Sequence, residues 1–263
     1  IAPLFAKNEK AKIVIPEGCV IGTRPVNFHL DALRLLGADI KLKNGYIEAS
    51  AKRLKGNNIR FEGVTVTGTE NLMMAASLAL GKTILTNVAR EPEIIDLADM
   101  LNSMGANISG AGTDEIIING VERLHGTEYM IPADRIEAGT YLAAAAVTKG
   151  DITIKGIDPN RLMRVIDKLR SAGANVEFNE DTISLSMTKD YPEPVDITTA
   201  PFPEFPTDMQ AQFSVINAIS RGTSNIYETV FENRFMHILE LNRMGCDIKV
   251  HGNHAIINGV ENL

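Results

Sequence analysis

Hydrophobic positions along the chain follow two alternating periods. Apolar side chains recur every three or four residues across 161–171, at Leu162, Val165, Ile166 and Leu169. This spacing predicts an amphipathic helix. The segments 174–178 and 182–186 alternate apolar and polar residues, which predicts two strands joined by a polar turn. Gly173 lies between the helix and the first strand, where it favours a left-handed helix end.

The same order of elements recurs four times. Each copy ends a helix with glycine, then Ala or Cys, then Asp or Asn, then Ile or Val; the glycines are Gly37, Gly105, Gly173 and Gly245. Helices predicted over 69–80, 139–148 and 210–220 lead into strands predicted over 82–85, 151–154 and 224–227. A unit of helix, strand, helix and two strands, about 70 residues long, is typical of an α/β domain built by internal duplication rather than of a solenoid.

The copies at the two ends are expected to be incomplete. We expect only the helix-to-strand end of the first copy, and we expect the last to stop at its second strand. The first residues are expected to be part of a helix, and they lack the layout of a signal peptide. A domain boundary is predicted near 129–132, where a strand-like run meets Pro132 between two repeats.

Composition narrows the possible functions of the chain. Its 263 residues suffice for one large domain or two ordinary ones, and 44% are hydrophobic and 22% charged. The net charge is -7 with scattered Lys and Arg, which argues against a nucleic-acid surface. No apolar run reaches the roughly 18 residues of a membrane span. Two distant cysteines indicate neither a disulfide framework nor a zinc site, and favour a reducing, cytoplasmic location.

Cys19 is the first candidate for chemistry. It lies between Gly18 and Gly22, with Arg24 five residues further on. Glycines favour an exposed loop, and a nearby cation favours the reactive thiolate. A buried cysteine that packs as a small apolar group is the alternative, and composition alone favours it.

Six motifs carry a resemblance that covers the whole chain. They occupy residues 16–26 (PEGCVIGTRPV), 66–71 (VTGTEN), 89–94 (AREPEI), 134–140 (DRIEAGT), 205–212 (FPTDMQAQ) and 228–235 (ETVFENRF). Together they resemble the bacterial UDP-N-acetylglucosamine enolpyruvyl transferases. The resemblance implies two inside-out α/β barrel domains of three repeats each, with helices in the core, sheets facing solvent and ligands between the domains. Residues 1–131 and 132–263 would each hold about two repeats, so we expect a central segment that lacks both ends.

The resemblance also implies a reaction. The family moves the enolpyruvyl group of phosphoenolpyruvate to the 3′-hydroxyl of UDP-N-acetylglucosamine and releases phosphate, the first committed step of peptidoglycan synthesis. This step serves cell-wall formation, cell shape and cell division. No cofactor, metal, nucleic acid or membrane takes part. Addition followed by elimination requires an acid for the methylene carbon, a base for the hydroxyl and cations for the phosphate.

The residues of the first motif take their roles from the resemblance. Cys19 matches the reactive cysteine, a general acid that is also the target of fosfomycin. Arg24 matches a contact to phosphoenolpyruvate and the nucleotide, and a guanidinium suits bidentate contact with phosphate. Pro25 would lie against the uracil ring. Val26, Asn27, Phe28 and His29 would continue that wall, although some relatives have aspartate in place of Asn27.

Other motifs supply further candidates. Asp208 matches the catalytic base, but Thr-Asp before a helix is also a common N-cap, and Thr207 is a second candidate for that cap. The diphosphate and uridine segment of relatives matches Thr65, Val66 and Thr67. Residues 67–69 stand just before the predicted helix. The backbone amides there could bind an anion, or the segment could be an ordinary helix cap.

Later contacts with the sugar nucleotide match Val230 and Arg234, and Arg135 faces the ligands in relatives. Glu91 and Glu93 do so as well, although an acidic pair at a helix start also favours the helix dipole. Cys246 replaces alanine in the repeat and is expected in the core.

Two alternatives remain open. One is an inactive fragment that still folds and binds nucleotide, and we expect little turnover from these 263 residues alone. The other is a shikimate-type enolpyruvyl transferase, against which the cysteine motif argues.

Overall fold

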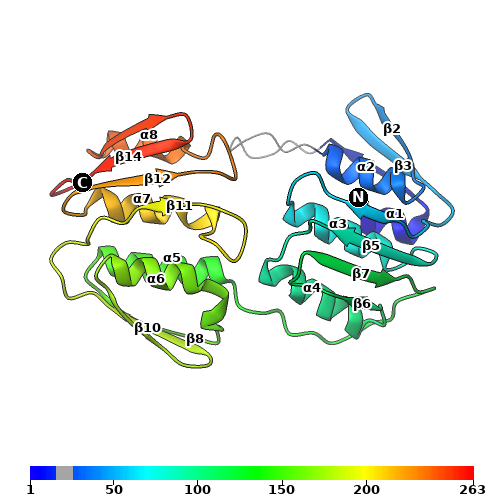
Figure 1. Ribbon diagram of the computed structural model, residues 1–263, viewed down its shortest axis with the longest axis horizontal. Helices are drawn as coiled ribbons and strands as arrows, with labels where there is room; N and C mark the ends of the chain where they lie inside the picture. The colour runs from blue at the N-terminus through cyan, green and yellow to red at the C-terminus, as the bar shows by residue number, and fades with distance from the viewer. Residues whose placement is uncertain (16–25) are drawn as a thin grey trace. The chain divides into compact units, whose positions relative to one another are not determined.

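The computed structural model describes residues 1–15 and 26–263, which form two compact units, each treated separately below. The described residues up to Ile131 belong to unit 1, and unit 2 holds the residues from Pro132 to Leu263 (Figure 1). The division lies within the segment where a domain boundary is predicted. The assignment of each unit to two repeats of a three-repeat domain stays a prediction.

The described residues of unit 1 form four helices and seven strands. They are α1 (Ala2–Asn8), β1 (Lys10–Val14), α2 (Asn27–Leu35), β2 (Asp39–Lys43), β3 (Tyr46–Ser50), β4 (Asn58–Arg60), α3 (Val66–Ala76), β5 (Lys82–Thr86), α4 (Pro92–Ser103), β6 (Ile108–Ser109) and β7 (Glu115–Asn119). The strands form one sheet of order β1-β3-β2 and one of order β4-β5-β7-β6. Only β4 and β5 pair in parallel among these strands.

Unit 2 repeats this plan. Its elements are α5 (Arg135–Val147), β8 (Asp151–Lys155), η1 (Pro159–Leu162), α6 (Met163–Ser171), β9 (Asn175–Phe178), β10 (Thr182–Ser186), β11 (Ile197–Thr198), η2 (Thr207–Met209), α7 (Gln210–Ala218), β12 (Thr223–Tyr227), α8 (Met236–Arg243), β13 (Asp247–His251) and β14 (His254–Asn258). Here the sheets have the orders β8-β10-β9 and β11-β12-β14-β13. The parallel pair β11–β12 corresponds to β4–β5.

Helices fill the interior of each unit. In unit 1, α3 packs against α1, α2 and α4, and its buried residues include Gly68, Leu72 and Ala75. In unit 2, α5 packs against α6 and α7. Small side chains let α5 be buried on most sides, as its run of four alanines predicts.

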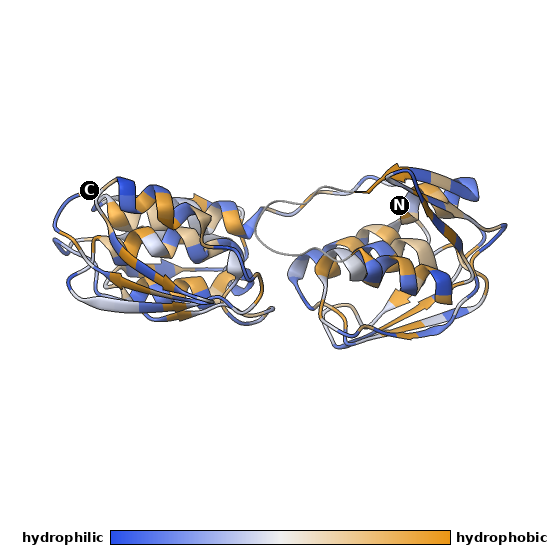
Figure 2. Ribbon diagram, turned by 90° about the horizontal axis from the view of Figure 1, so that it is seen from above, coloured by the Kyte–Doolittle hydropathy of each residue, from blue (hydrophilic) through white to orange (hydrophobic). Residues whose placement is uncertain are grey.

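The strands lie outside the helices and alternate between a buried and a more exposed face. In β10, Ile183 and Leu185 are buried and pair with Ile154 and Ile152 of β8. Figure 2 shows hydrophobic residues interspersed with polar ones along the helices and strands. Helices inside and sheets outside are the predicted inside-out arrangement. The two sheets of each unit do not join into a closed barrel in the described parts of the chain.

The helix ends follow the predicted chemistry. The four repeat glycines all have positive φ, from 94° at Gly37 to 106° at Gly245. Two helix starts lie three to four residues earlier than predicted. Thr65 caps α3, and the Asp134 carboxylate caps α5 by accepting from the amides of Ile136 and Glu137.

The prediction about the extent of the first copy is wrong, and so is the strand character of the run near 129–132. The first copy is not restricted to its helix-to-strand end, because it also has helix α1 and strand β1, and β1 pairs with β3. The strand-like run near 129–132 forms no strand. Between Asn119 and Arg135 the chain has no helix or strand, and Met130 and Ile131 are exposed rather than paired in a sheet.

Candidate functional site

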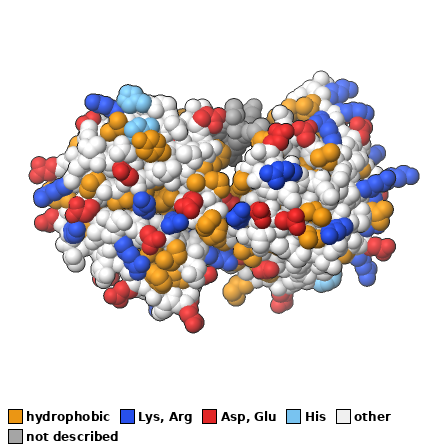
Figure 3. All heavy atoms as spheres, viewed as in Figure 1, with side chains coloured by type: hydrophobic (Ala, Val, Ile, Leu, Met, Phe, Trp, Pro, Cys, Tyr) orange, Lys and Arg blue, Asp and Glu red, His pale blue; other side chains and the backbone are white. Residues whose placement is uncertain are grey.

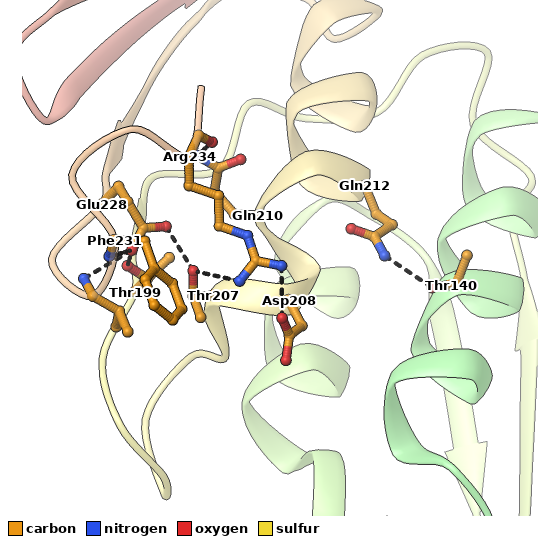
Figure 4. Close-up of polar contacts among 10 residues, drawn as sticks. Thr140, Thr199, Thr207, Asp208, Gln210, Gln212, Glu228, Phe231 and Arg234 are labelled. Carbon is orange, nitrogen blue, oxygen red and sulfur yellow. Dashed lines mark hydrogen bonds and ion pairs between the residues drawn. The ribbon is translucent and has the colours of Figure 1, made fainter. Parts of the chain in front are cut away.

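In unit 2, two predicted site residues lie side by side. Asp208 belongs to η2 at the start of α7, and Arg234 comes from the loop between β12 and α8. Nη2 of Arg234 lies 2.6 Å from Oδ1 of Asp208, and the second carboxylate oxygen points away from the guanidinium (Figure 4). The Asp208 side chain is 51% exposed and that of Arg234 is 23% exposed. The fold therefore joins two motifs into an open carboxylate held by a largely buried cation.

Asp208 and Thr207 do not cap the helix. The N-cap of η2 is Pro206 and that of α7 is Met209, and neither position has a side-chain cap. The Thr207 hydroxyl instead donates to Oε2 of Glu228 at 2.9 Å, and Nη1 of Arg234 donates to it at 3.2 Å. The capping alternative for both residues is therefore wrong, which leaves Asp208 available for chemistry.

Glu228 is a functional candidate that the sequence did not reveal. It follows β12, is 1% exposed, and lies beside Thr207 (Figure 4). Its Oε1 accepts from the amides of Val230 and Phe231. The loop that contains Val230 is therefore held from its first residues by a buried carboxylate. A glutamate directly after a predicted strand was the available signal.

Side chains of α7 connect this site to its surroundings. Gln210 is fully buried and donates to the backbone oxygen of Arg234 at 3.1 Å. Gln212 donates to the Thr140 hydroxyl of α5 at 2.9 Å (Figure 4). Arg135, a predicted substrate contact, is 7% exposed, and its guanidinium lies 5.8 Å from the centre of the Phe202 ring.

In unit 1, the structure brings two predicted nucleotide segments together. Asn27, Phe28 and His29 form the start of α2, which Val26 precedes, and Val66 and Thr67 form the start of α3. The Phe28 ring lies about 4.0 Å from the point where a Cβ on Gly63 would be. Nδ1 of His29 lies 3.0 Å from Nδ2 of Asn71 on α3. The contact between His29 and Asn71 joins α2 to α3, the helices whose first residues carry the two predicted segments.

The state of His29 follows from its neighbours. Oδ1 of Asn71 accepts from the amide of Ala2, so Nδ2 of Asn71 faces the imidazole as a donor. Nδ1 of His29 is then an acceptor, which requires a neutral ring with its hydrogen on Nε2. Burial lowers the pKa of His29. A neutral His29 is consistent with a wall for a planar base.

The start of α3 is an ordinary helix cap. Oγ1 of Thr65 accepts from the amide of Gly68 at 3.2 Å. Thr67 and Thr69 lie within the first turns of the helix rather than before it, so the predicted start of this helix is wrong, and an anion site at 67–69 stays a prediction. The hydroxyl of Thr69 donates to the Thr65 carbonyl and accepts from the Ala89 amide. Contact of 65–67 with a nucleotide stays a prediction.

Acidic side chains gather near the start of α4. Glu91 is its N-cap residue without a side-chain cap, and Glu93 lies in its first turn. Burial raises the pKa of Glu70 on α3, and the nearby carboxylates of Glu93 and Glu91 raise it further. Glu93 therefore suits the helix dipole, whereas Glu70 pays a desolvation cost in this cluster.

The remaining predicted residues divide into two classes. Cys19, Arg24 and Pro25 lie outside the described residues. Cys246 is 8% exposed in the core of unit 2, which confirms its predicted place, and burial raises the pKa of its thiol.

Surface and metal chemistry add little in the parts of the chain that the structure describes. No group of His, Cys, Asp and Glu there has the arrangement of a metal site. No described helix is long and apolar enough to cross a membrane. On the face shown in Figure 3, basic and acidic side chains are interspersed rather than collected in one basic patch.

Comparison with known proteins identifies the family. The model of the EPSP synthase (3-phosphoshikimate 1-carboxyvinyltransferase) family matches residues 1–263. The chain is 54% identical over 263 residues to the UDP-N-acetylglucosamine 1-carboxyvinyltransferase of Hydrogenovibrio crunogenus (strain DSM 25203 / XCL-2). That alignment covers 100% of this chain and 63% of the relative, so the chain spans less than two thirds of the relative's length.

Two solved structures share the fold. The enolpyruvyl transferase NikO from Streptomyces tendae matches with a TM-score of 0.83 at 23% identity, over 98% of this chain and 62% of that one. EPSP synthase from Acinetobacter baumannii matches with a TM-score of 0.68 at 20% identity, again over 98% and 62%. These matches confirm the predicted enolpyruvyl transferase fold. With the family model matched from end to end, the chain belongs to the EPSP synthase (3-phosphoshikimate 1-carboxyvinyltransferase) family.

Proposed function

We propose that the chain contributes to a UDP-N-acetylglucosamine enolpyruvyl transferase, which moves the enolpyruvyl group of phosphoenolpyruvate to the 3′-hydroxyl of UDP-N-acetylglucosamine. The 54% identity to a relative of that name favours this reaction over the shikimate-type alternative, whose solved example is 20% identical. The observation that carries the proposal is the Arg234–Asp208 pair. Its role would be in the cytoplasm, in the committed step of peptidoglycan synthesis.

The pair suits the base that this reaction requires. The guanidinium holds one oxygen of Asp208 at 2.6 Å and leaves the other free to accept a proton, while half of the side chain remains accessible. A positioned carboxylate acts as a general base when the substrate hydroxyl comes within hydrogen-bond reach. Asp208 therefore takes the proton of the 3′-hydroxyl as that oxygen bonds to C2 of phosphoenolpyruvate.

The other roles rest on the resemblance. Cys19 gives a proton to the methylene carbon during addition, which produces a tetrahedral intermediate. Elimination then removes a proton from the methyl carbon and releases phosphate. Arg24 and Arg135 supply positive charge for the ligands, and Pro25 starts the uracil wall.

The nucleotide segments also support binding. Val26, Asn27, Phe28 and His29 continue the wall that starts at Pro25. Thr65, Val66 and Thr67 bind the diphosphate and uridine, and Val230 binds the sugar nucleotide. The contact between His29 and Asn71 joins the helix that follows Val26 to the helix that follows Thr65, which supports a common nucleotide wall in unit 1.

Phosphate release by the full-length protein that contains this chain tests the proposal. Asp208→Asn keeps the shape of the side chain but removes the base, so kcat falls by about 10²- to 10⁴-fold. Asp190→Asn is the matched control, because Asp190 pairs with Lys149 at an exposed site in the same unit and is expected to keep the normal rate. A normal rate for Asp208→Asn would refute the assigned base.

A further inference from the structure

Glu228 stands out as a buried carboxylate without a cationic partner in the described contacts. It is 1% exposed, and the four donors that its side chain accepts from in the described structure are all neutral. A buried carboxylate is costly unless hydrogen bonds satisfy it. Glu228 lies beside Thr207, the residue before the proposed base, and it begins the loop that contains Arg234 (Figure 4).

One oxygen of Glu228 fixes the loop backbone. Oε1 accepts from the amides of Val230 at 2.8 Å and Phe231 at 3.0 Å, and from the Thr199 hydroxyl at 2.8 Å. Oγ1 of Thr199 in turn accepts from the amide of Thr229 at 3.0 Å. Three successive amides of the loop are thus bound to Glu228 or to its partner, which restrains the backbone that leads to Arg234.

The other oxygen sets the direction of a hydroxyl. Oε2 accepts from Thr207 at 2.9 Å, and the hydroxyl of threonine has a single hydrogen to donate. Because Thr207 donates this hydrogen to Glu228, its oxygen can accept only through its lone pairs, and Nη1 of Arg234 donates to it from 3.2 Å. Nη2 of the same guanidinium then meets Asp208.

We infer that Glu228 is a positioning residue for the proposed base. It acts through Thr207 and Arg234, and it orients Asp208 without touching substrate. This inference rests on the proposed function, because it assigns Glu228 to the same site. The hydrogen bonds run in one direction: Arg234 donates to Thr207, and Thr207 donates to Glu228.

Two substitutions break this order at different points. Glu228→Gln retains an oxygen for Thr199 and the loop amides, but turns an amide nitrogen toward Thr207, so the hydroxyl loses its acceptor. Thr207→Val removes the hydroxyl at nearly equal volume, whereas Thr207→Ser retains it. Thr83→Val is the matched control, since Thr83 is buried in unit 1 and its hydroxyl has no partner in the described structure.

Steady-state kinetics of the full-length protein that contains this chain test the inference. We expect Glu228→Gln and Thr207→Val each to lower kcat about tenfold, the effect of losing one hydrogen bond to a charged group, with KM for UDP-N-acetylglucosamine nearly unchanged. Thr207→Ser should restore most of kcat. The double variant should be no slower than Thr207→Val alone, because both changes interrupt one chain of contacts. Thr83→Val should keep the normal kcat.

The outcomes separate the inference from the proposed function. Normal kcat in Glu228→Gln and Thr207→Val, with Asp208→Asn inactive, overturns the inference and leaves the base in place. Losses that multiply in the double variant, or a raised KM with normal kcat, also overturn it. An active Asp208→Asn overturns the proposed function itself. Far-ultraviolet circular dichroism checks that each variant is folded. If Glu228→Gln does not fold, the comparison of Thr207→Val with Thr207→Ser tests the inference.

Discussion

Two buried threonines of unit 1 should respond in opposite directions to the same substitution. Thr69 of α3 and Thr83 of β5 are both 0% exposed. The hydroxyl of Thr69 donates to the Thr65 carbonyl at 2.8 Å and accepts from the Ala89 amide at 3.1 Å. That of Thr83 has no hydrogen-bond partner in the described part of the chain. We predict that Thr69→Val destabilises unit 1 and that Thr83→Val stabilises it.

The magnitudes follow from what each methyl group replaces. Thr69→Val leaves the buried amide of Ala89 without an acceptor, which costs about 1–3 kcal/mol in free energy of unfolding. Thr83→Val removes an unsatisfied hydroxyl and buries one more carbon, a gain of about 1–2 kcal/mol. The two variants should therefore differ by roughly 3 kcal/mol. Helix propensity contributes little to this difference because Thr and Val rank close together.

Urea unfolding followed by circular dichroism measures both variants against the unchanged chain. The midpoint of the unit 1 transition should fall for Thr69→Val and rise for Thr83→Val, with equal slopes. The transition of unit 2 is the internal control, since neither residue belongs to it. If both midpoints shift in the same direction, hydrogen bonding does not decide how the loss of a buried hydroxyl changes stability.

Three further predictions concern unit 2 and the thiols. Burial lowers the pKa of His237 below its ordinary 6.5, so the unfolded chain binds more protons than the folded chain, and the free energy of unfolding falls as the pH drops below about 6.5. Urea titrations at several pH values should show that this free energy depends less steeply on pH in His237→Gln. Because burial raises the pKa of Cys246, a thiol reagent should label it slowly, and Cys246→Ser should leave a fast phase from Cys19 unchanged. Gly245→Ala should lower the free energy of unfolding by about 1 kcal/mol, and with it the melting temperature, because φ is 106° at this position. Gly126→Ala is the control and should leave the melting temperature unchanged, because Gly126 has open space around it and no positive φ.

Local signals made much of the fold predictable. Gly173 ends its helix at φ 99° because a helix that must turn into a strand needs a residue free to adopt that conformation. The starts of α3 and α5 were misplaced because Thr65 and Asp134 cap them ahead of the apolar period. Helix α1 agrees with the helix expected for the first residues, whereas strand β1 was not anticipated.

The site was predictable only in part, because a local motif identifies a candidate residue, whereas its contacts come from segments that are distant in sequence. Asp208 was identified from its motif, but the same Thr-Asp pair also fits a helix cap, and a local pattern cannot separate the two. The choice depends on Arg234 and Glu228, which lie 26 and 21 residues from their partners Asp208 and Thr207 in sequence. Once the fold brings them close, the single hydrogen of Thr207 can serve only one acceptor. The burial of Glu228 makes that acceptor costly to lose. This is why we assign the order of the contacts to Glu228, whose place at the start of a motif and directly after a predicted strand did not by itself indicate that role.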